Sequence, residues 1–125
     1  MNYTSIEESK KLIELGLNRD TADLVYQFNF LIEENDDQPN FVSGSLHDTP
    51  LENIPCWSIG ALLKVMPKCI VVEHRNYFSY IVCLDTVSYE DTKGNVIIRF
   101  HYDTLFDSIY AIVVWLLENN YVKKD

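Results

Sequence analysis

Six side chains in this sequence are of the types that most often do chemistry. They are Cys56, Cys69, Cys83, His47, His74 and His101. The cysteines are separated by 13 and 14 residues, which matches no zinc or redox motif, and each histidine stands alone in its segment. A metal site needs three or four converging ligands, and a covalent enzyme needs a base beside its nucleophile. The spacing therefore predicts no catalytic, cofactor-binding or metal-binding residue.

The thiol of Cys56 and the imidazole of His47 flank a single predicted loop. They are the arrangement closest to a nucleophile with its base. The competing interpretation is a buried thiol and a surface histidine, which the apolar neighbours of all three cysteines favour. We predict free, reduced and buried cysteines. An unrecognised small hydrolase or thiol enzyme remains the alternative function.

A second pair, Asp85 with His101, depends on the register of a hairpin. If residues 92–94 form its loop, Asp91 faces Asn95 and Asp85 lies opposite His101. A carboxylate beside an imidazole favours the protonated ring, as general acid–base chemistry requires. The competing interpretation, which we prefer, is an exposed cross-strand pair that stabilises the sheet by about a few tenths of a kcal/mol. A slip of one residue would separate the two side chains.

Two helices are predicted from their capping residues. Ser5 and Glu8 form a capping box at the start of a helix over residues 6–15. Ser58 caps a second helix, which Pro67 ends. The apolar stripe of this second helix is spaced at i, i+3, i+4 and i+7. Its members are Ile59, Leu62, Leu63 and Met66.

A third helix is predicted over residues 105–119, capped by Asp103 or Thr104. Its centre, residues 109–117, is apolar on every side, so the helix must be covered on more than one side. Either the sheet and the other helices cover it, or part of it lies in a subunit interface. The apolar run is far shorter than a membrane span, which needs about 20 residues.

Several segments alternate with a period of two or are rich in β-branched and aromatic residues, which indicates strands. They are residues 24–32, 41–46, 69–74, 77–90 and 95–102, with a turn at residues 35–40. Residues 20–23 could instead cap a helix in place of the first strand. The strand over residues 77–90 is long, so we expect a bend or bulge within it. Arg75 and Asn76 are the predicted connection before it.

These elements predict one α+β domain spanning residues 1–125. About three helices pack on one antiparallel sheet of four to five strands, and the C-terminal helix is buried. The first residues lack a secretory signal, so we expect a cytoplasmic protein that does not bind membranes.

The charge is uneven and strongly acidic. The net charge is −9, and residues 1–60 hold 11 acidic and 3 basic residues. This field repels nucleic-acid backbones, so we predict no direct nucleic-acid binding. The acidic charge, the apolar last helix and the lack of a catalytic signature together predict a non-enzymatic domain. We expect this domain to bind another protein or a second copy of itself. The competing interpretation of the acidic run at residues 33–37 is a solvated loop that keeps the protein soluble.

Three blocks of sequence together carry a resemblance that spans most of the chain. They are Leu15-Gly16-Leu17 with Thr21-Ala22-Asp23, Ile54-Pro55 with Trp57-Ser58 and Ala61-Leu62-Leu63 through Met66-Pro67, and Trp115-Leu116-Leu117-Glu118-Asn119 with Tyr121. This layout resembles a group of short proteins encoded by gut bacteria and their prophages, to which no activity is assigned. The resemblance implies a mobile-element origin and no catalytic residue. Ala is commoner in the group at the position of Cys56 and Gly at that of Asn120, which weakens Cys56 as a nucleophile and changes the last helix cap.

Overall fold

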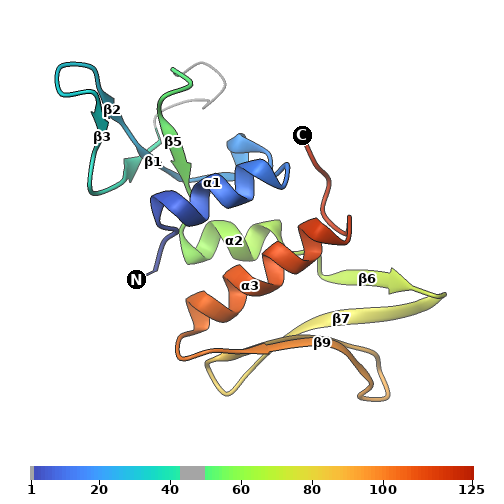
Figure 1. Ribbon diagram of the computed structural model, residues 1–125. Helices are drawn as coiled ribbons and strands as arrows, with labels where there is room; N and C mark the ends of the chain where they lie inside the picture. Colours follow the sequence, from blue (N-terminus) through green and yellow to red (C-terminus); the bar gives the residue numbers. More distant parts are fainter. Residues whose placement is uncertain (1, 43–49) are drawn as a thin grey trace.

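Three helices form the middle layer of the protein, between a larger and a smaller group of strands (Figure 1). The computed structural model describes residues 2–42 and 50–125. The helices are α1 (Ile6–Glu14), α2 (Ile59–Val65) and α3 (Leu105–Glu118), with a 3-10 turn at Arg19–Thr21. The strands are β1 (Leu24–Tyr26), β2 (Phe28–Asn29), β3 (Glu34–Asn35), β4 (Asn40–Phe41), β5 (Ile54–Cys56), β6 (Cys69–Val72), β7 (Arg75–Val82), β8 (Thr86–Glu90) and β9 (Val96–His101). The predicted α+β class is confirmed.

Within residues 2–42 and 50–125 the strands pair antiparallel and divide into three sheets. The largest has the order β6-β7-β8-β9, a second has the order β4-β1-β5, and β2 pairs with β3 alone. The predicted single sheet of four to five strands therefore corresponds to the four-stranded sheet, and the earlier strands lie on the other side of the helices (Figure 1).

The helices begin where their capping residues predict. Ser5 Oγ accepts a hydrogen bond from the Glu8 N–H at 3.1 Å, and Glu8 Oε1 accepts one from the Ser5 N–H at 2.9 Å, which completes the capping box. Ser58 Oγ accepts from the Ala61 N–H at 3.2 Å at the start of α2, and Thr104 caps α3. These contacts use short-range geometry, so they could be predicted without knowledge of the tertiary fold.

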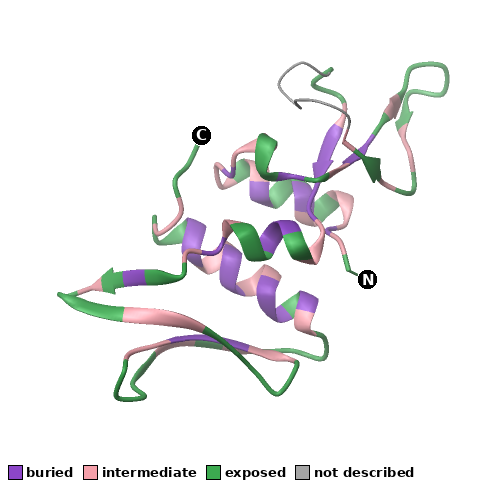
Figure 2. Cartoon of the chain, turned by 180° about the vertical axis from the view of Figure 1, so that it is seen from behind, coloured by how far each residue is buried: buried purple, intermediate pink, exposed green. Residues whose placement is uncertain are grey.

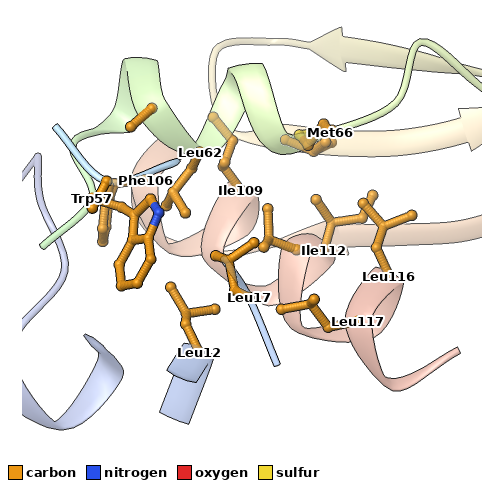
Figure 3. Close-up of a cluster of buried hydrophobic side chains, with 14 of the residues drawn as sticks. Leu12, Leu17, Trp57, Leu62, Met66, Phe106, Ile109, Ile112, Leu116 and Leu117 are labelled. Atoms are coloured by element: carbon orange, nitrogen blue, oxygen red, sulfur yellow. The ribbon is translucent and has the colours of Figure 1, made fainter. Parts of the chain in front are cut away.

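The buried face of α3 is the centre of the core, because side chains from every layer pack on it (Figure 3). Leu12 comes from α1, Leu62 from α2, and Val87 and Tyr89 from β8, and all four are fully buried. Figure 2 shows purple, buried stretches on the helices, on the middle of the larger sheet, and on β1 and β5. The predicted burial of the C-terminal helix is confirmed. Its buried apolar residues are Phe106, Ile109, Ile112, Val113, Leu116 and Leu117.

A buried polar cluster around Thr4 joins the N-terminal segment to the smaller sheet. The Thr4 Oγ1 atom accepts from the Trp57 N–H at 3.0 Å and lies 2.7 Å from Ser9 Oγ. The Thr4 carbonyl accepts from the Tyr26 hydroxyl at 2.8 Å and from the Cys56 thiol at 3.2 Å. Thr4 has no exposed surface, so its polar atoms cannot bond to water. These hydrogen bonds take the place of the lost bonds to water.

The predicted strand over residues 24–32 is wrong in its second half. The chain leaves β1 after Tyr26, forms β2, and reverses at residues 30–33. Asn29 is the local cause, because its Oδ1 accepts from the Leu31 N–H at 2.9 Å and so starts a turn. The predicted turn at residues 35–40 is also wrong at its ends, which belong to β3 and β4. The predicted return strand over residues 41–46 falls mostly outside the described residues.

Two further turns differ from the prediction in the larger sheet. The predicted strand over residues 77–90 is two strands, β7 and β8, because Cys83 and Leu84 take positive φ values of 56° and 64° and reverse the chain. The connection before it is Glu73–His74, with φ values of 50° and 68°, and not Arg75-Asn76. Paired positive φ values are typical of tight hairpins, but these turns lack the Gly or Asn-Gly signal by which such turns are recognised.

We predict that Leu116→Ala destabilises the protein by about 2–5 kcal/mol, because it opens a cavity in a fully buried site on α3. The free energy of unfolding from urea denaturation measures the loss. Leu31→Ala is the matched control, since Leu31 is 94% exposed and its truncation should change stability by less than about 0.5 kcal/mol. Equal losses in both variants would contradict the assigned core.

Candidate functional site

Cys56, the predicted candidate nucleophile, is fully buried in the polar cluster around Thr4. Burial raises the pKa of its thiol, and the hydrogen bond from Thr4 offsets only part of that effect. A buried protonated thiol is a poor nucleophile. Its predicted partner, His47, lies outside the described residues. The geometry of Cys56 is therefore that of a structural thiol.

The other two cysteines are exposed, so the prediction that all three are buried is wrong for them. Cys69 begins the edge strand β6, and Cys83 lies in the turn between β7 and β8. His74 is exposed in the turn between β6 and β7. Within residues 2–42 and 50–125, no three His, Cys, Asp or Glu side chains lie close enough together to hold a metal ion.

The structure brings Asp85 and His101 together, but not in the predicted register. Asp91 pairs with Asn95 as predicted, and its N–H donates to the Asn95 carbonyl at 2.9 Å. A bulge between Tyr89 and Glu90 then shifts the register by one residue, so Thr86 lies opposite His101. Asp85 still contacts the histidine, with 3.4 Å between Asp85 Oδ1 and His101 Nδ1, because it stands at the end of the turn beside Thr86.

Thr86 completes this contact, because its Oγ1 lies 2.9 Å from His101 Nδ1 and 3.1 Å from Asp85 Oδ1. Thr86 and His101 alternate along their strands with Val87 and Phe100, which pack on the core, so they lie on the face of the larger sheet that is turned away from the helices. The His101 side chain is 66% exposed, and none of the three lines a cavity described in the structure. An exposed pair of this kind stabilises a protein by about 0.2–1 kcal/mol. The interpretation as a surface cross-strand contact therefore fits the geometry.

The most conspicuous exposed feature is the hairpin formed by β2 and β3, which projects from the layer of helices (Figure 1). Its tip carries three consecutive large apolar residues. Phe30 is 62% exposed, Leu31 94% and Ile32 62%. Acidic residues follow at once along the chain: they are Glu33, Glu34, Asp36 and Asp37. We name residues 30–32 the hairpin tip.

The base of this hairpin is held by side chains from neighbouring segments. Asn53 Oδ1 accepts from the Phe28 N–H at 2.8 Å, and the Asn35 amide donates to the carbonyl oxygens of Tyr26 at 3.2 Å and Glu52 at 2.8 Å. The rings of Phe28 and Phe30 pack edge to face, with 4.9 Å between their centroids. The tip is thus held out from the body by an ordered base.

Sequence reasoning missed the hairpin tip. The alternation of Tyr26, Phe28, Phe30 and Ile32 predicts one continuous strand with these residues on one side, whereas the chain reverses after Asn29 and only Tyr26 of the four is buried. Asn29 is the signal of this turn in the sequence, because asparagine side chains favour turns. A turn at Asn29 places the chain reversal before the acidic run.

Comparison of the chain with protein-family models, with curated proteins and with solved structures gives no match. None of the described helices is both long enough and apolar enough to cross a membrane.

We predict that alkylation separates the three cysteines by their burial. In the native protein, iodoacetamide should modify Cys69 and Cys83 readily, whereas Cys56 should react only as the protein unfolds, because its thiol is both buried and protonated. Mass spectrometry of peptides from timed reactions measures the three rates. In urea all three rates should become similar, which serves as the control. Native labelling of Cys56 as fast as that of Cys83 would contradict the structural role.

Proposed function

We propose that this protein is a non-enzymatic interaction domain that binds another protein by inserting the hairpin tip into an apolar pocket with a basic rim. The single observation that supports this most strongly is the exposure of Phe30, Leu31 and Ile32 at the end of a projecting hairpin.

The exposed tip favours binding, since removing one large apolar side chain from water stabilises a complex by about 1.5–3 kcal/mol. Isolated exposed apolar residues are ordinary on a protein surface, but three in succession on one projection form a patch of the kind found at binding sites. The hydrogen bonds of Asn35 and Asn53 order the hairpin in advance, so less conformational entropy is lost on binding.

The charges around the hairpin favour a basic protein as the partner. Four carboxylates follow the hairpin tip within five residues of the sequence, and the net charge of the whole chain is −9. Lysines and arginines around the partner's pocket would complement these negative charges. The same carboxylates repel nucleic acid and anionic membrane surfaces. Two copies meeting through their tips would also bring like charges together, so we assign the partner as a different protein.

The alternative of a small hydrolase or thiol enzyme is not part of this proposal. Its best candidates would be Cys56, which is buried and protonated, and the Asp85–His101 contact, which is exposed to solvent. The resemblance to short proteins of gut bacteria and their prophages adds a setting to the proposal, in which the domain is a cytoplasmic accessory protein of a mobile element.

The test compares Leu31→Ser with Leu84→Ser. Both leucines are highly exposed, Leu31 at 94% and Leu84 at 85%, but Leu84 lies in the turn between β7 and β8. A partner captured by the wild-type protein should bind Leu31→Ser about tenfold or more weakly and Leu84→Ser with unchanged affinity. Titration calorimetry with the purified partner measures both dissociation constants. Equal affinities for the wild-type protein and Leu31→Ser would rule out the hairpin tip as the binding element.

A second variant tests whether the order of the hairpin matters. Asn53→Ala removes the acceptor of the Phe28 N–H but leaves the tip residues unchanged. We expect weaker partner binding, because a looser hairpin must be ordered when the complex forms. Circular dichroism should show that the helices remain folded. Full affinity in Asn53→Ala would contradict the role of preorganisation, while the Leu31→Ser result would still decide the site.

A further inference from the structure

A groove runs along the partly buried side of α3, remote in sequence from the hairpin tip. Its volume is about 510 Å³. The floor is a stripe of α3 residues spaced three or four apart, which places them on one side of the helix. Phe100 of β9 and Tyr102, which follows directly after that strand, line one part of the groove, and Lys11 of α1 lines another. The α3 residues are Asp107, Tyr110, Ala111, Val114, Trp115 and Glu118.

This stripe is the part of α3 that the described residues of the chain leave incompletely covered. Tyr110, Ala111, Val114 and Trp115 are only partly buried, unlike the residues on the opposite side of the helix. In Figure 1, α3 lies towards the viewer and no described helix or strand crosses it. Burial, with a smaller effect from Glu8, raises the pKa of Tyr110 to about 12, so its hydroxyl is neutral in the groove. The centre of the groove is therefore apolar and uncharged.

The charged residues of the groove lie at its ends and on one wall. Asp107 stands at one end and Glu118 at the other, and both are exposed. They are eleven positions apart on one helix, which corresponds to about 16 Å or three turns. Lys11 supplies the single positive charge, on the α1 wall. The lining thus offers an apolar centre between two carboxylates.

This pattern argues against a second copy of the chain as the occupant. In a two-fold symmetric, antiparallel pairing of α3 helices centred on the groove, Asp107 of one protomer faces Glu118 of the other, so both ends bring like charges together. An amphipathic helix of another protein complements the groove if it carries lysine or arginine at two positions three turns apart, with apolar residues between them. Its apolar stripe would then cover the centre of the groove, and its cations would pair with both carboxylates.

We propose that the groove along α3 is a second docking surface, which binds a basic amphipathic helix of another protein. Binding at this groove is independent of the hairpin tip, because no groove residue belongs to the hairpin. The two surfaces would allow the domain to hold two segments of one partner or to join two partners.

Two synthetic helical peptides of 16 residues are the probes, each with leucines along one face. One carries lysines eleven positions apart at the edge of that face, and the other carries glutamates at the same positions. We expect the lysine peptide to bind the full chain at least about tenfold more tightly than the glutamate peptide. Fluorescence anisotropy of labelled peptides measures both affinities, and a change in the fluorescence of Trp115 reports contact with the groove, since Trp57 is fully buried.

Three variants locate the binding site. Asp107→Lys combined with Glu118→Lys changes only exposed positions and should reverse the preference between the two peptides. Ala111→Glu places a charge in the middle of the groove and should abolish binding of the lysine peptide. Leu31→Ser, which removes the centre of the hairpin tip, should leave peptide binding unchanged, so failure of the groove is distinguishable from failure of the proposed function.

Several outcomes would overturn the proposal. They are no binding of the lysine peptide to the folded protein at millimolar concentration, equal binding of both peptides, or no reversal in the double lysine variant. Sedimentation of the full chain adds a further check. A dimer that Ala111→Glu dissociates would assign the groove to a second copy of the chain and would also overturn the proposal.

Discussion

The architecture depends on one constraint, the need to cover a helix that is apolar on every side. Residues 109–117 of α3 contain no charged side chain, so water must be kept from several of its faces at once. The larger sheet covers one side, and α1 and α2 cover another, which places α3 between that sheet and the other two helices (Figure 3). The groove is what remains where neither layer closes over the helix. The same constraint therefore explains both the core and the proposed second docking surface.

Polar contacts tie the strands on the far side of the helices to the rest of the chain. Thr4 ties the N-terminal segment to β5, while Asn35 and Asn53 tie the hairpin of β2 and β3 to the chain beside it. Hydrogen bonds of this kind contribute modest net stability but define geometry, because unmade bonds to buried groups are costly. A hairpin held in this way can present an apolar tip to solvent without collapsing onto the core.

The two proposed surfaces share a chemistry although they lie on different elements. The hairpin tip is a projection and the α3 groove is a depression, yet each combines apolar centres with nearby carboxylates. Both would select partners with basic residues around an apolar feature, which agrees with the acidic charge of the whole chain. The Asp85–His101 contact lies on the sheet face turned away from the helices, where its main effect is on strand pairing.

The sequence by itself determined the features that depend on neighbours a few residues away. The Ser5–Glu8 capping box, the Ser58 cap and the pairing of Asp91 with Asn95 follow from local hydrogen bonds, so they could be predicted together with the helices and the α+β class. Only the tertiary structure decided where the strands reverse and which of their apolar residues face water. An alternating pattern is the same whether the chain continues or turns, and Phe30 stays exposed because no segment among the described residues covers it.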